Sequence, residues 1–163
     1  YTLAAVYQSS PHSSSCGIYK ASTSTSGEYF LFENRSPGGY DEGLYYKILW
    51  GNTSYLAGSN TYFTGGVAIW HVKDILSSCS NISTNNCQAQ SPKLVDLEEA
   101  NDGDLDNDVS NKGRTTHLFY SGNSVSFTNS STPDSKLYDC SSSGISATSI
   151  SGAGDSMTLT ISK

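Results

Sequence analysis

The chain of 163 residues is long enough to form a sizeable hydrophobic core, and we expect residues 1–163 to fold as a single domain. Its net charge is −6 and its nine Lys and Arg residues are scattered, which argues against a nucleic-acid-binding protein because phosphates need a basic patch. Apolar runs are far shorter than the roughly 18 residues that a membrane helix needs, so we expect no membrane span.

The composition favours an all-β extracellular domain. Only 15% of the residues are charged, Ser, Thr, Asn and Gly are abundant, and there are 11 tyrosines. Tyr and Thr are enriched in strands, whereas the helix-favouring residues Ala, Leu, Glu and Lys rarely recur at helical spacing. We therefore expect strands rather than long helices.

Apolar patterns predict five strands in the first part of the chain, over residues 2–7, 17–21, 28–35, 44–50 and 67–72. The strands at 28–35 and 67–72 are the best candidates for the centre of the core. The first carries bulky apolar side chains on both faces, as expected of a strand that is covered on both sides. In the second, Val67, Ile69 and His71 share one face because side chains alternate along a strand.

Four further strands are predicted over residues 93–97, 124–128, 144–150 and 157–161. The last two are separated by the Gly-rich residues 151–155, which favour a hairpin turn. Eight or nine short, mainly antiparallel strands joined by loops rich in Gly, Asn and Ser are typical of a β-sandwich.

Four cysteines are present, namely Cys16, Cys79, Cys87 and Cys140. Their spacing matches neither a CxxC pair nor a zinc site. An even number of cysteines in an acidic chain rich in Ser, Thr and Asn predicts two disulfides in an oxidising, extracellular compartment. Three pairings are possible; we favour Cys79 with Cys87, which closes a local loop, and Cys16 with Cys140, which connects the two ends. Four reduced thiols are the alternative.

An acidic loop follows the strand at 93–97. Its carboxylates alternate with other residues at Asp102, Asp104, Asp106 and Asp108. So many carboxylates in one short loop repel one another unless a hard cation neutralises them, and calcium takes six to eight oxygen ligands at about 2.3–2.6 Å. The loop is not an EF-hand, because Asn107 and Gly113 stand where Gly and Glu are required. We predict a calcium site here; a solvated loop without metal is the alternative.

The three histidines are far apart and do not form an HExxH motif. His71 lies within an apolar strand, so we expect a hydrogen-bonded core histidine. His12 and His117 have polar neighbours in the sequence, and we expect both on the surface.

Candidate groups for hydrolysis are few. No GxSxG elbow for a nucleophilic serine is present. A pair of carboxylates for glycoside hydrolysis would come from the acidic residues Glu28, Glu33, Asp41 and Glu42, which are close in sequence. Glu33, however, precedes Arg35 by two residues in a mainly apolar strand, which favours a structural ion pair.

Several blocks of the sequence occur in an order that indicates a family. They are GEYFLFENR at 27–35 with GYD at 39–41, GGVAIWHV at 65–72, VDLEEA at 95–100 with DLD at 104–106, SKLY at 135–138, SGI at 143–145 and MTL at 157–159. In this order they resemble secreted metallopeptidases of the immune inhibitor A type, from about residue 27 to the C-terminus.

The resemblance implies a piece of a larger secreted bacterial protein. In that family the zinc-binding HExxH helix lies upstream of this region, and this chain does not contain it, so zinc would belong to the upstream catalytic domain. The chain would be a non-catalytic accessory region that contacts the catalytic domain or the protein substrate. It departs from the family after the acidic loop, where residues 113–120 replace an Asp/Gly/Pro-rich run and remove possible oxygen ligands.

Two other classes of function remain as alternatives. A free-standing extracellular module that binds glycan or a cell surface would use exposed tyrosines and Trp50 or Trp70 as a stacking platform. An independent hydrolase would need clustered carboxylates with perturbed pKa values in a cleft.

Overall fold

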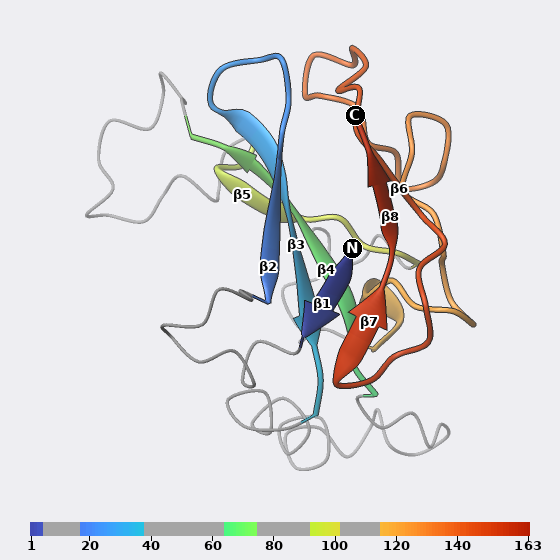
Figure 1. Ribbon diagram of the computed structural model, residues 1–163. Coiled ribbons are helices and arrows are strands. Elements are labelled where there is room, and N and C mark those ends of the chain that lie inside the picture. The colour runs from blue at the N-terminus through green and yellow to red at the C-terminus, as the bar shows by residue number, and fades with distance from the viewer. Residues whose placement is uncertain (5–16, 38–63, 75–91, 102–114) are drawn as a thin grey trace, which may run out of the picture.

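A computed structural model describes residues 1–4, 17–37, 64–74, 92–101 and 115–163 (Figure 1). Within these ranges the chain is all-β, as predicted: it has eight strands and a single short 3-10 turn, η5 (Thr115–His117). No helix in these ranges is long and apolar enough to cross a membrane.

Four antiparallel strands form the larger sheet, in the order β2-β3-β4-β5. They are β2 (Ile18–Ser22), β3 (Glu28–Arg35), β4 (Gly66–Lys73) and β5 (Val95–Leu97). The strands β3 and β4 pair along their whole length, from Glu28 opposite Lys73 to Arg35 opposite Gly66. Beyond the end of β5, Phe119 pairs with the same edge of β4, since its main chain exchanges two hydrogen bonds with Val67.

Two short antiparallel ladders form the second layer, beside the larger sheet in Figure 1. One pairs β1 (Thr2–Ala4) with β7 (Ser156–Thr158), and the other pairs β6 (Ser146–Thr148) with β8 (Thr160–Ser162). The first strand of the chain is therefore hydrogen-bonded to one of the last.

The hydrophobic core lies between the layers. From the larger sheet it takes Phe30, Phe32 and Ile69, each with 0% exposure. From the second layer it takes Phe127 and Met157. We call residues 124–163 of this second layer, with the segments that join its strands, the C-terminal layer. The rings of Phe30 and Phe127 meet edge to face, with their centroids 5.2 Å apart. Each large apolar side chain that is fully buried contributes on the order of 1.5–3 kcal/mol to stability. We call this face of the larger sheet the inner face and the opposite one the outer face.

The two central strands agree with the predictions. β3 has the predicted bounds, and the predicted strand 67–72 lies within β4. Val67, Ile69 and His71 are all buried on the inner face, as their alternation indicates. The strand predicted at 44–50 lies outside the described residues.

Two predicted strands differ from the structure. Residues 157–161 form two strands, because β7 pairs with β1 whereas β8 pairs with β6, and the chain changes partner at Leu159. Residues 124–128 form only isolated bridges, since Phe127 bonds Ala147 while the next residue, Thr128, pairs with Asp134 in the parallel sense. Changes of partner of this kind depend on the tertiary structure and leave no trace in a local apolar pattern.

Candidate functional site

Three ionisable side chains meet at one end of the larger sheet. Glu28 is the first residue of β3 and pairs with Lys73, the last residue of β4, while Phe30 pairs with His71. Because side chains alternate along strands and paired residues share a face, Glu28, His71 and Lys73 all lie on the inner face. The register of β3 and β4 thus places a carboxylate, an imidazole and an ammonium group together.

His71 lies between two carboxylates. Its Nε2 is 2.9 Å from Oε1 of Glu28, and its Nδ1 is 3.1 Å from Oε1 of Glu98. The side chain of His71 is 3% exposed and that of Glu28 is 1% exposed. Glu98 comes directly after β5, and its main-chain nitrogen is fixed by a 2.9 Å hydrogen bond to the carbonyl of Ile69. The prediction of a hydrogen-bonded core histidine is confirmed.

Glu28 accepts hydrogen bonds from two further donors. Lys73 Nζ donates to Oε2 at 2.6 Å, and the main-chain N–H of Tyr138 donates to Oε1 at 2.8 Å. Burial by itself would raise the pKa of Glu28, but the hydrogen bonds from Lys73, Tyr138 and His71 outweigh it and hold this pKa below the ordinary value of a glutamate. Glu28 is therefore an ionised carboxylate at neutral pH.

Glu98 has the opposite perturbation. Burial raises the pKa of Glu98, and the hydrogen bond and charge of His71 offset this only in part. The carboxylates of Asp96 and Asp134 raise it further. One imidazole thus lies between a carboxylate that resists protonation and one that favours it.

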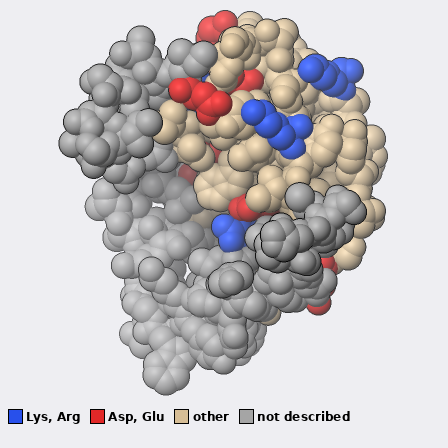
Figure 2. Space-filling model, turned by 60° about the vertical axis from the view of Figure 1, so that its left-hand side comes forward, with Lys and Arg blue, Asp and Glu red and all other residues tan. Residues whose placement is uncertain are grey.

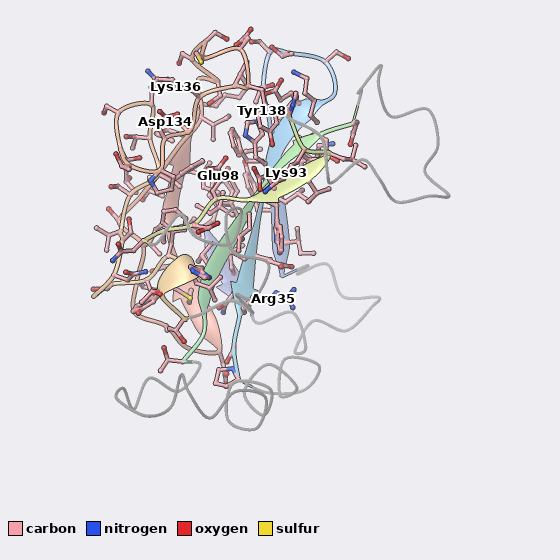
Figure 3. The ribbon with its side chains drawn as sticks, turned by 180° about the vertical axis from the view of Figure 1, so that it is seen from behind. Arg35, Lys93, Glu98, Asp134, Lys136 and Tyr138 are labelled. Carbon is pink, nitrogen blue, oxygen red and sulfur yellow. The ribbon has the colours of Figure 1, made fainter. Side chains whose placement is uncertain are left out.

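Tyr138 covers the imidazole. Its ring stacks on that of His71 with 4.1 Å between centroids and 6° between planes, and Phe30 contacts the same imidazole at 4.5 Å. Figure 3 shows that Tyr138 and Glu98 come from separate segments and lie near the same end of the sheet. We call Glu28, His71, Lys73, Glu98 and Tyr138 the His71 cluster. It joins β3, β4, the segment after β5 and the C-terminal layer.

The outer face of the sheet carries a second, smaller network. Oε1 of Glu33 accepts hydrogen bonds from Arg35 Nε and from Trp70 Nε1, both at 2.8 Å. The predicted ion pair between Glu33 and Arg35 is confirmed. Because Glu33 and Glu28 lie on opposite faces of β3, they do not form the carboxylate pair of a glycosidase. Asp41 and Glu42 lie outside the described residues.

The prediction of a surface position for His117 is wrong. His117 is 1% exposed and ends the turn η5, and its carbonyl accepts a 3.0 Å hydrogen bond from the main-chain nitrogen of Ala100. The apolar residues that follow it, Leu118 and Phe119, carry the chain into the core, which was the available signal. His12 lies outside the described residues.

The predicted metal and disulfide residues are mostly outside the described part of the chain. This holds for Asp102, Asp104, Asp106 and Asp108, and for Cys16, Cys79 and Cys87. Cys140 is described and exposed. Among the residues that the structure describes, no group of three or more His, Cys, Asp or Glu side chains is arranged to hold a metal ion. The calcium site and both disulfides stay predictions.

The described surface carries charges of both signs, interspersed among uncharged residues on the face shown in Figure 2. Aromatic side chains also reach the surface. The rings of Tyr1 and Tyr19 lie 4.3 Å apart and their hydroxyl groups are 3.1 Å apart, and Lys20 Nζ lies 3.4 Å above the ring of Tyr29. Trp70 is half-buried, and its Nε1 donates a hydrogen bond to Glu33. Trp50 is not among the described residues.

Sequence reasoning found His71 but missed its partners Glu98, Lys73 and Tyr138. The signal for Lys73 was the strand register, which places it opposite Glu28; Tyr138 gives no comparable signal, because it is 110 residues away from Glu28. Four of the sequence blocks named above, at 27–35, 65–72, 95–100 and 135–138, contribute residues or neighbouring backbone to the His71 cluster. Comparison with family models, with curated proteins and with solved structures found no match for this chain.

Proposed function

We propose that the chain is a non-catalytic β-sandwich accessory region of a secreted bacterial metallopeptidase of the immune inhibitor A type. One observation carries this proposal: the sequence blocks that resemble this family converge on the His71 cluster, whose ionisable groups are bonded to one another. Both ring nitrogens of His71 and both oxygens of Glu28 are used inside the cluster. Groups used in this way stabilise a fold, whereas catalysis needs groups that reach a substrate.

In this proposal, zinc and the HExxH helix belong to a catalytic domain upstream, and the accessory region contacts that domain or the protein substrate. A calcium ion bound by Asp102, Asp104, Asp106 and Asp108 would stabilise it. Disulfides between Cys79 and Cys87 and between Cys16 and Cys140 would do so in the extracellular space.

The size, location and upstream sequence of the native polypeptide that contains this chain test the proposal. An antibody raised against the chain isolates it from the culture medium and from the cells of the source organism, and mass spectrometry reads the residues upstream. We expect a secreted polypeptide much larger than 17.4 kDa with an HExxH motif, and with zinc-dependent hydrolysis of casein. A native polypeptide without that motif, or one that stays inside the cell, would overturn the proposal.

The same full-length protein separates an accessory role from a catalytic one. Replacing the glutamate of the upstream HExxH motif should abolish peptide hydrolysis. Glu98→Gln, in the His71 cluster, should leave kcat per folded molecule unchanged. Loss of kcat in a folded Glu98→Gln protein would contradict the non-catalytic role.

A second candidate is an extracellular glycan-binding module, for which the exposed ring of Tyr1 beside the half-buried ring of Tyr19 is the specific observation. Aromatic rings at a surface can stack on sugar rings. Titration with a panel of soluble oligosaccharides, followed by tyrosine fluorescence, tests it. Saturable binding that Tyr19→Ala removes and Tyr29→Ala retains would favour this candidate over the first.

A further inference from the structure

We propose that the His71 cluster is a proton-dependent latch, which holds Tyr138 of the C-terminal layer against the larger sheet and releases it when the pH rises. The latch is a property of the described fold, so it does not depend on the proposed accessory function.

Both hydrogen bonds of the His71 ring to carboxylates need a proton. Each ring nitrogen of His71 faces a carboxylate oxygen, at 2.9 Å for Glu28 and 3.1 Å for Glu98. An ionised carboxylate oxygen can accept a hydrogen bond but cannot donate one, and the same is true of an unprotonated ring nitrogen. Each contact therefore needs one proton. The proton facing Glu28 belongs to the ring, and the one facing Glu98 belongs either to the ring or to the carboxyl group.

The proton between His71 and Glu98 is the one that can be lost, and we call it the shared proton. A neutral imidazole keeps one N–H, which Glu28 takes, so its Nδ1 then faces Glu98 with a lone pair. If Glu98 is ionised as well, two acceptors oppose each other at 3.1 Å in a buried site. That arrangement costs free energy because neither the Nδ1 lone pair nor the facing Glu98 oxygen has a hydrogen-bond donor or full hydration. The closed geometry therefore needs the shared proton.

Tyr138 is the part of the C-terminal layer that this proton controls. Its ring stacks on the imidazole at 4.1 Å, and its main-chain N–H donates to Glu28 at 2.8 Å. The neighbouring Ser135 is fully buried, and its Oγ donates to the carbonyl of Ile145 at 2.6 Å. Movement of the imidazole away from Glu98 disturbs the stacking and the Glu28 carboxylate together, so it loosens Tyr138 first.

The negative charges around the cluster favour retention of the shared proton. The charged groups next to His71 within the cluster are Glu28 on β3, Lys73 on β4 and Glu98 directly after β5. Asp96 of β5 and Asp134 of the C-terminal layer add negative charge, although each also bonds a lysine, Lys93 at 2.8 Å and Lys136 at 2.7 Å respectively. Burial first, and these two carboxylates after it, raise the pKa of Glu98.

The latch opens at alkaline pH rather than at mildly acidic pH. The closed form holds the shared proton more tightly than the open form does, so its stability is full at low pH and is lost as the pH rises through the titration of the closed cluster. At the acidic end, Glu28 has a pKa below the ordinary value, so it keeps its three hydrogen bonds until the pH falls below about 4.5, the ordinary value for glutamate.

The experiment measures hydrogen exchange at the Tyr138 amide by NMR between about pH 5 and about pH 9, the range on either side of the ordinary histidine titration. The protection factor, which is the exchange rate of an unstructured peptide divided by the observed rate at the same pH, removes the intrinsic effect of base. We expect this factor to be constant at low pH and then to fall about tenfold per pH unit, as one released proton requires. The ¹⁵N shifts of the His71 ring should change over the same interval.

Two variants isolate the shared proton. In Glu98→Gln the side-chain amide can donate its N–H to an unprotonated Nδ1 of His71, so Tyr138 should stay protected at high pH. In Asp96→Asn the altered carboxylate bonds Lys93 and not Nδ1, so the fall should remain. A protection factor that is independent of pH in the unmodified chain, or an equal fall in Glu98→Gln, would overturn the latch. The ring ¹⁵N shifts of the unmodified chain decide the matter if Glu98→Gln does not fold.

Discussion

Glu28 is the residue on which most contacts of the His71 cluster depend. Its two oxygens accept hydrogen bonds from His71, Lys73 and the main chain of Tyr138, which come from β4 and from the C-terminal layer. A buried carboxylate is stable only when such partners offset its loss of hydration. Removal of its charge therefore leaves several donors without a full acceptor.

We expect Glu28→Gln to lower the free energy of unfolding by about 3 kcal/mol, the usual cost of breaking a buried ion pair from one side. The urea midpoint, at unchanged slope, measures this. The matched control is Lys136→Met, which breaks the half-exposed pair with Asp134 and should cost less than about 1 kcal/mol. Equal losses in the two variants would show that the Glu28 pair contributes no more than a surface pair.

Gly66 is a second residue whose identity the fold requires. Its φ is +152°, and a Cβ there would lie 2.7 Å from Cβ of Leu118 and 3.2 Å from the carbonyl oxygen of Phe119. Both neighbours belong to the segment that pairs with the start of β4, so they cannot move without loss of the Val67–Phe119 bonds.

We expect Gly66→Ala to destabilise the protein by about 1–3 kcal/mol, the range for overpacking and backbone strain. Gly152→Ala is the control, because a Cβ at Gly152 meets nothing within 4 Å. It should change stability by less than about 0.5 kcal/mol. Thermal unfolding of both proteins compares them, and a Gly66→Ala midpoint equal to that of Gly152→Ala would contradict the steric argument.

At the scale of elements, β4 organises the molecule. It pairs with β3 along its whole length, with β5 at one end and with Phe119 at the other. Apolar residues lie on both of its faces, including Ile69 on the inner face and Ala68 on the outer face. This pattern is why β3 and β4 could be predicted from the sequence: a strand covered on both sides is apolar throughout.

Elements that depend on distant partners could not be predicted in the same way. The division of residues 157–161 follows from β1, which is more than 150 residues away and takes β7 as its partner. The burial of His117 depends on its contact with Ala100 and not on its polar neighbours in the sequence. Tyr138 likewise reaches His71 only because the C-terminal layer closes over the sheet. Local patterns carry no record of such contacts.

Phe127 lies at the contact between the two layers, so its replacement tests how much this contact stabilises the fold. It is fully buried, its ring centroid lies 5.2 Å from that of Phe30 and 5.8 Å from that of Phe119, and its main chain bonds Ala147. We expect Phe127→Ala to cost about 3–5 kcal/mol because the cavity is enclosed by both layers. Val125→Ala, at a site that is 44% exposed, should cost less than about 0.5 kcal/mol. Urea unfolding that shows similar losses for both would refute this account of the core.

At the scale of the whole molecule, composition predicted the class of fold but not the site. Many strand-forming residues and few charges suffice to indicate an all-β chain. The His71 cluster depends on the strand registers and on the layer that covers the sheet. In the sequence its members are only single acidic and aromatic residues far from one another. The acidic loop is the reverse case: its carboxylates are plain in the sequence and lie outside the described residues.

We expect calcium to raise the thermal unfolding midpoint relative to excess chelator at fixed ionic strength. A ligand bound only by the folded state adds about 2.7 kcal/mol at a hundred times its Kd. Asp104→Ala combined with Asp106→Ala should abolish the rise, while Asp134→Ala, outside the loop, should keep it. An unchanged midpoint with calcium would identify the loop as solvated and free of metal.

The pairing of β1 with β7 also decides how the molecule responds to force. The main chains of Tyr1 and Leu159 exchange hydrogen bonds of 2.7 and 3.0 Å, at the end of the ladder where Thr2 faces Thr158. Tension applied between Tyr1 and Leu159 would reach this ladder at that end, so its bonds would break one after another instead of sharing the load. A pull on residue 163 meets β8 first, and because β8 is paired with β6, that second ladder shields the β1–β7 pairing from the C-terminal side.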